Sequence, residues 1–201
     1  ERTQMDHKQY QYDGVRWIVN NETRPDPQSN IRGGFIADEM GLGKTIMMIG
    51  TLICNFLPKT LIVVPPVLVN QWFTQIYRTT GHKAVVYHGT NKKQITREVL
   101  DKAAIVITTY GAITLTHKQL KEGEVTLLHK ISWDRVVYDE AHHMMNMVSH
   151  GSWVLGHLPE LHPAICHPLL IEVDNMSRKT TPPHLQTQRT SHRQRPGHAC
   201  L

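Results

Sequence analysis

The chain has 201 residues, of which 40% are hydrophobic and 19% charged, a composition typical of one folded domain with a sizeable core. It contains no run of about 18 apolar residues, and its polar N-terminus lacks the apolar stretch of a secretory signal, so we expect neither a membrane span nor a leader. The net charge of +5 suits a polyanionic partner without requiring one. The three cysteines form no C-x-x-C pair, which argues against a disulfide framework or a zinc site.

Apolar runs alternate with amphipathic stretches over residues 1–146. Short β-branched runs that stop at proline or polar residues are typical of buried parallel strands, and such runs occur at 61–64, 85–87, 104–109 and 135–138. The intervening segments predict helices at 45–56, 71–77 and 92–102. In the first helix a single apolar face is expected at helical spacing, made of Ile49, Leu52, Ile53 and Phe56. Alternating strands and helices predict an α/β fold, a three-layer parallel sheet with helices on both faces.

The final part of the chain, residues 147–201, differs in character. It holds half of the 14 histidines and more than half of the 11 prolines. Residues 153–173 are apolar but interrupted by prolines, and two interpretations stay open: this segment docks on the sheet, or it is an out-of-frame or mis-spliced end. Residues 175–201 lack apolar periodicity and predict disorder. Together with the missing initiator Met, this tail suggests that the chain is a fragment.

The most informative segment joins a short apolar run to a glycine-rich loop and then to a helix. The loop comprises Asp38, Glu39, Met40, Gly41, Leu42, Gly43, Lys44 and Thr45. Glycines let backbone N–H groups point at phosphate oxygens, and the helix N-terminus adds its positive dipole end. Lys44 is expected to reach the β- and γ-phosphates of a nucleotide, and the Thr45 hydroxyl to ligate Mg²⁺. Asp38 stands where the strict pattern has glycine, so a chance helix cap is the alternative.

A second segment ends an apolar strand with two carboxylates, Asp139 and Glu140. Hydrolysis of a nucleoside triphosphate needs a carboxylate that holds the metal ion and a group that orients water. Asp139 suits the first role, together with Thr45, and Glu140 suits the second. Both residues follow a strand, and ligands bind open α/β sheets at the carboxyl ends of their strands. An ordinary strand-end turn is the alternative, and the phosphate loop upstream makes it less favoured.

These two segments resemble the helicase-like ATPases, and residues 37–45 resemble the Swi/Snf-type form of the loop in particular. Upstream, residues 10–17 are similar to the adenine-sensing segment of that family, which implies that Gln11 hydrogen-bonds the adenine edge. Later motifs follow in the order of the family at 61–65 with 70–72, at 87–89 and at 107–110. The resemblance extends over about residues 8–146.

The resemblance implies a RecA-like P-loop NTPase lobe at 1–146, incomplete at its C-terminal side, followed by an atypical tail at 147–201. It implies a nuclear, ATP- and magnesium-dependent translocase on double-stranded DNA that works in chromatin remodeling or DNA repair, with nucleosomes as a further partner. Residues near the DNA backbone are then Thr108, Thr109 and Tyr110. In the DEAH box at 139–142, His142 is implied to couple the nucleotide to the interface between motor lobes.

The chain departs from the family pattern in three places. Met144 and Met145 replace an expected basic residue, and residues 147–201 contain nothing like the Thr-Gly-Thr-Pro motif that comes next in the family. The second motor lobe, which carries the arginine fingers, is also absent from this chain. We therefore expect the chain alone to bind ATP but to hydrolyse it poorly. A truncated, non-motor module that binds ATP or DNA is the alternative function.

Other candidate residues are weaker. Trp72 lies in an apolar helical context and is interpreted as core, and Lys92 and Lys93 as solvated side chains. Adjacent histidines such as His142 and His143 do not converge well on one metal ion. A GTPase would need Asp after Asn-Lys-x, and the run that begins at Asn91 lacks it.

Overall fold

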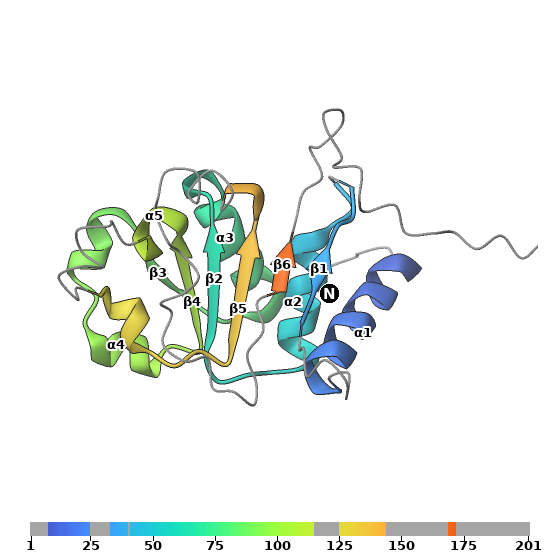
Figure 1. Ribbon diagram of the computed structural model, residues 1–201, viewed down its shortest axis with the longest axis horizontal. Helices are drawn as coiled ribbons and strands as arrows, with labels where there is room; N and C mark the ends of the chain where they lie inside the picture. Colours follow the sequence, from blue (N-terminus) through green and yellow to red (C-terminus); the bar gives the residue numbers. More distant parts are fainter. Residues whose placement is uncertain (1–7, 25–32, 40, 115–124, 144–168, 172–201) are drawn as a thin grey trace, which may run out of the picture.

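The computed structural model describes residues 8–24, 33–39, 41–114, 125–143 and 169–171. Within this part of the chain the strands form one parallel sheet in the order β1-β6-β5-β2-β4-β3 (Figure 1). The strands are β1 (Phe35–Ile36), β2 (Thr60–Val64), β3 (Val85–Tyr87), β4 (Ile105–Thr109), β5 (Arg135–Asp139) and β6 (Leu169–Ile171). The predicted parallel α/β fold is confirmed.

Strands β2, β4 and β5 are buried along their whole length. Successive side chains of a strand point to opposite sides of the sheet, so these strands contribute to a core on each face. In β2, Ile62 and Val64 join one core, and Leu61 and Val63 join the other. The first core is covered by α1 (Gln9–Thr23), α2 (Lys44–Cys54) and α3 (Val69–Thr80). The second is covered by α4 (Arg97–Lys102), α5 (Tyr110–Ile113) and the 3-10 helix η3 (Leu127–Lys130). A run of apolar residues without alternation, as in β2, fits such a doubly covered strand.

The helices differ from their predicted bounds. The helix expected at 45–56 ends at Cys54, and its outer positions Ile53 and Phe56 are exposed rather than part of the apolar face. Met47 and Met48 occupy the buried face instead, since α2 is turned toward both the sheet and α1. The helix expected at 92–102 is divided into the 3-10 helix η2 (Gly89–Lys93) and α4. Among the described residues, no helix has the length and apolarity that crossing a bilayer requires.

Strand β6 comes from the segment for which two interpretations were open. It lies between β1 and β5, and its register pairs Leu169 with Val137 and Ile171 with Asp139. Docking on the sheet is therefore what the structure shows for residues 169–171. The division of the chain at residue 146 stays a prediction, and the disorder expected at 175–201 concerns residues outside the described part.

A buried ion pair fixes α1 to the base of the sheet. Arg135, at the start of β5, donates from Nε and Nη2 to the two carboxylate oxygens of Glu22 in α1, both at 2.6 Å. The Asn55 amide, at the end of α2, donates to the same carboxylate at 2.7 Å, and its backbone carbonyl accepts from Arg135 at 2.8 Å. This cluster joins α1, α2 and β5.

Candidate functional site

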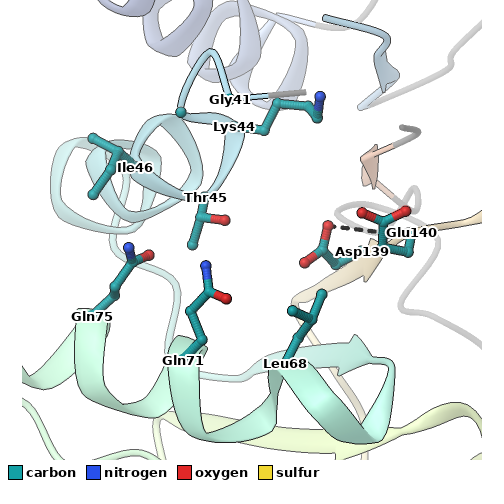
Figure 2. A pocket seen from close by; sticks show the side chains of 10 residues that line it. Gly41, Lys44, Thr45, Ile46, Leu68, Gln71, Gln75, Asp139 and Glu140 are labelled. Atoms are coloured by element: carbon teal, nitrogen blue, oxygen red, sulfur yellow. Dashed lines mark hydrogen bonds between the residues drawn. The ribbon is translucent and has the colours of Figure 1, made fainter. Parts of the chain in front are cut away.

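A pocket of about 250 Å³ lies where α2 and α3 begin and where β5 ends. Figure 2 shows the side chains of Thr45, Gln71 and Asp139 directed into the same space, from three different elements. The pocket is lined by Gly41, Gly43, Lys44, Thr45, Ile46, Leu68, Gln71, Gln75, Asp139 and Glu140. The fold thus brings together the two segments that the sequence singled out, at the edge of the sheet where parallel strands expose their carboxyl ends.

The glycine-rich loop has the backbone conformation that a phosphate cradle needs. Gly41 and Gly43 both have φ of 84°, in the left-handed region that favours glycine. Gly43 caps α2 without any side-chain hydrogen bond, and a Cβ on Gly43 would lie 2.4 Å from Nε2 of Gln11. The first N–H groups of α2 therefore lack a side-chain acceptor, which makes this helix end suited to an anion.

Lys44 is buried and closes the loop on itself. Its Nζ donates hydrogen bonds to the backbone carbonyl of Asp38 and, at 2.9 Å, to that of Glu39. Figure 2 shows the side chain running away from Thr45, along the loop. An ammonium group carries three N–H donors, and these two carbonyls take two of them. Met40 lies outside the described residues.

Asp139 ends β5 as a buried carboxylate with one hydrogen bond to each oxygen. Trp72 Nε1 donates to Oδ2 at 2.7 Å, and the backbone N–H of Glu140 donates to Oδ1 at 3.1 Å. Burial raises the pKa of Asp139, while the Trp72 hydrogen bond and, more weakly, the Lys44 charge act to lower it. A carboxylate held this way fits a cation, whose charge would offset the desolvation that ionisation costs there.

The donor set around Asp139 suits magnesium rather than a caged transition metal. Among the described residues, no three His, Cys, Asp or Glu side chains are grouped to hold a metal ion. Mg²⁺ commonly takes one or two carboxylates and fills its remaining positions with water and substrate phosphates. Thr45 and Asp139, which line one pocket beside a phosphate-type loop, meet that requirement.

Glu140 has an unusual backbone conformation at the mouth of the pocket. Its φ of 55° is the only positive value among the described non-glycine residues. Such conformations cost energy and are found most often at functional sites. Burial and the neighbouring Asp139 charge raise the pKa of Glu140, and His142 Nδ1 lies 3.3 Å from its Oε2. Glu140 is thereby a partly buried carboxylate with a basic neighbour, placed beside the pocket.

The structure adds pocket residues to which the sequence assigned no role, although Gln71 lies in the motif at 70–72. Gln71 and Gln75, one helical turn apart on α3, line the pocket opposite the loop, with Leu68 before them. The Oε1 atom of Gln75 is buried without a hydrogen-bond partner. Their spacing of four residues, on the helix that follows the strand ending at Val64, was the available signal. Trp72 is buried as expected, but it also serves Asp139 as a hydrogen-bond donor.

Gln11 lies against the loop and is not among the residues that line the pocket. Its Nε2 donates to the backbone carbonyl of Leu42 at 3.0 Å, and the same atom is the nearest neighbour of a Cβ built on Gly43. The Gln11 amide is therefore in direct contact with the loop. Recognition of an adenine edge by Gln11 stays a prediction.

The three residues expected near DNA are buried in this structure. Thr108 Oγ1 donates to the carbonyl of Tyr87 at 2.9 Å. Thr109 Oγ1 lies 3.2 Å from His88 Nδ1. Tyr110 Oη donates to the carbonyl of Asp139 at 2.7 Å. The reason is that β4 is an inner strand, flanked by β2 and β3 and followed directly by α5. Contact of these three residues with a DNA backbone stays a prediction.

Comparison with known proteins gives consistent matches. Residues 10–162 match the SNF2-related domain family. The chain is 31% identical over 166 residues to an uncharacterized ATP-dependent helicase of Schizosaccharomyces pombe, covering 72% of the chain and 15% of that protein. It is 34% identical over 151 residues to the chromatin structure-remodeling complex protein SYD of Arabidopsis thaliana, covering 69% of the chain and 4% of that protein.

Among solved structures, the fold is similar to that of the Sulfolobus solfataricus SWI2/SNF2 ATPase core in complex with double-stranded DNA. The TM-score is 0.61 at 20% identity, over 85% of this chain and 32% of the solved one. At that identity the likeness establishes the fold alone. The chain thus spans less than a third of the solved core and less than a fifth of the two curated relatives.

Proposed function

Because the chain belongs to the SNF2-related domain family, we propose that it is the ATP-binding lobe of an ATP-dependent translocase on double-stranded DNA. The observation that carries the proposal is the shared pocket of Lys44, Thr45 and Asp139, whose loop and carboxylate stand about 95 residues apart in the sequence. Neither segment would require the other if each were only a structural turn. A triphosphate beside the loop and a magnesium ion beside the carboxylate account for both.

Each residue then has a distinct task. Backbone N–H groups at the start of α2 and the Lys44 ammonium hold the phosphates, and Thr45 with Asp139 would hold magnesium, which neutralises charge on the phosphate oxygens. Glu140 accepts a hydrogen bond from the attacking water and orients it toward the terminal phosphorus. His142 Nδ1 lies 3.3 Å from Glu140 Oε2, and a proton on the His142 ring would make this contact an ion pair.

We propose double-stranded DNA as the partner of the whole protein, in the nucleus and with nucleosomes as a further substrate. Support comes from similar proteins, one a chromatin structure-remodeling complex protein and one a SWI2/SNF2 ATPase core whose structure was solved in complex with double-stranded DNA. The net charge of +5 agrees with a polyanionic partner.

These 201 residues by themselves should bind ATP and hydrolyse it slowly. An arginine finger contributes about 10³- to 10⁵-fold to turnover in related phosphoryl transfer, and the described residues place no arginine among those that line the pocket. Turnover by the purified chain at the rate of a complete motor, stimulated by DNA, would contradict this expectation. A non-motor module that only binds ATP or DNA is the second candidate function.

The test of the site is nucleotide binding by Lys44→Ala, with Lys102→Ala as the matched control on the exposed side of α4. A fluorescent ATP analogue is titrated into each variant in the presence of Mg²⁺. We expect Lys44→Ala to lose at least tenfold in affinity, about the worth of one charge-assisted hydrogen bond, and Lys102→Ala to match the unmodified chain. Equal affinity in all three proteins would refute the assignment of the loop.

A further inference from the structure

We propose that Trp72 is a positioning residue for Asp139, holding its carboxylate in the orientation that receives magnesium beside Thr45. The inference rests on the proposed function and extends it to a residue of α3 that belongs neither to the phosphate loop nor to the acidic segment. Its basis is one short, fully buried hydrogen bond, 2.7 Å from Trp72 Nε1 to Asp139 Oδ2.

The hydrogen bonds of Asp139 leave a defined part of the carboxylate for a ligand. Each ionised carboxylate oxygen can accept about two hydrogen bonds. Oδ2 receives one from Trp72 and Oδ1 one from the Glu140 backbone, so each oxygen keeps capacity for a further contact. Trp72 is not among the residues that line the pocket, whereas Asp139 and Thr45 both are, and Figure 2 shows these two side chains directed into one open space. The carboxylate thus keeps capacity for a further contact while it faces the pocket that it shares with the phosphate loop.

Trp72 is itself held rigidly. Its ring belongs to the first core, together with Val69 and Ile76 of the same helix, and is only 1% exposed. A buried indole N–H needs an acceptor, and a backbone carbonyl would suffice, as Trp133 shows by donating to Leu128 at 3.0 Å. Trp72 instead donates to the side chain that faces the pocket, and a ring locked by packing fixes the rotamer of its acceptor.

The experiment compares nucleotide affinity with and without magnesium in Trp72→Phe, which keeps most of the ring volume and removes the N–H donor. Trp133→Phe is the matched control, because it removes the same donor from an equally buried indole on the opposite face of the sheet. Affinity for a fluorescent ATP analogue is measured by anisotropy, in excess MgCl₂ and in EDTA, for the full chain. Circular dichroism checks that each variant is folded.

We expect Trp72→Phe to bind the analogue in EDTA as the unmodified chain does, and to lose about 10- to 100-fold in affinity for Mg²⁺. Asp139→Asn should lose the same magnesium-dependent part, and the double variant should lose no more than Asp139→Asn, because both act through one carboxylate. Trp133→Phe should keep both affinities. A titration of Mg²⁺ at fixed analogue concentration reports the change directly.

Several outcomes would overturn the inference. Trp72→Phe could retain the full magnesium effect, or it could lose affinity equally in EDTA and in MgCl₂, which would indicate a role in packing alone. The proposed function fails separately: the unmodified chain would then bind no nucleotide, or Asp139→Asn would keep the magnesium effect. A loss in Trp133→Phe equal to that in Trp72→Phe would also refute a specific role for Trp72.

Discussion

The ion pair between Glu22 and Arg135 offers a sharp test of how the lobe is held together. The Arg135 side chain is 2% exposed and that of Glu22 10%, and two hydrogen bonds of 2.6 Å join them. Replacing Glu22 with alanine leaves a guanidinium buried without its counter-charge and removes the acceptor of the Asn55 amide. The backbone carbonyl of Asn55 would remain as a partner of Arg135.

The expected cost follows from burial. Removing one partner of a buried pair typically destabilises a protein by about 3–5 kcal/mol, a large share of the roughly 5–15 kcal/mol that stabilises an ordinary domain. The chain contains a contrasting pair, Arg97 and Asp101, whose side chains are 55% and 48% exposed one turn apart on α4. An exposed helical pair of that kind contributes about 0.3–0.5 kcal/mol.

The assay is equilibrium unfolding in urea, followed by circular dichroism, for Glu22→Ala and for Asp101→Ala as the control. We expect the first variant to lose several kcal/mol and the second less than about 1 kcal/mol. Added salt should weaken only the exposed pair. The double variant Glu22→Met with Arg135→Met should be more stable than Glu22→Ala, because it leaves no unpaired buried charge. Equal losses in Glu22→Ala and Asp101→Ala would refute this reasoning.

Three further outcomes are expected. Gly43→Ala should lower the free energy of unfolding by about 1–3 kcal/mol and weaken nucleotide binding, because the new Cβ meets Gln11. Gly41→Ala, at the same φ of 84° but in open space, should weaken binding less. Equal losses of nucleotide affinity in the two variants would contradict this prediction. Burial raises the pKa of Asp139, so the folded lobe holds that proton more tightly than the unfolded chain, and the free energy of unfolding should fall as pH rises from about 4 through the raised pKa. Urea unfolding at a series of pH values should show a weaker dependence of the free energy of unfolding on pH in Asp139→Asn. An unchanged dependence in that variant would contradict the raised pKa of Asp139. Tyr110→Phe removes the hydroxyl that donates to the backbone carbonyl of Asp139, which should cost about 1–3 kcal/mol of stability and lower the melting temperature. A melting temperature that calorimetry finds unchanged would refute this prediction.

The sequence by itself determined the fold class and the two halves of the candidate site. The β-branched run at 61–64 and the apolar run before Asp139 are local patterns. A strand that is buried on both faces requires apolar side chains at successive positions, so the sequence shows it directly. The glycines of the loop likewise reflect a backbone requirement, because φ of 84° at Gly41 and Gly43 is costly for other residues. The family resemblance was carried by the same residues and is confirmed by the match over 10–162.

Only the tertiary structure decided which side chains meet. Periodicity shows that a residue is apolar or lies on a buried face, but it does not give the order of strands in a sheet. That order makes β4 an inner strand, in which Thr108 and Thr109 are buried. It also sets α3 beside the end of β5, so that Trp72 reaches Asp139 across 67 positions of sequence, and Arg135 reaches Glu22 across 113. Contacts between such distant residues depend on how whole elements pack, and no local pattern contains that information.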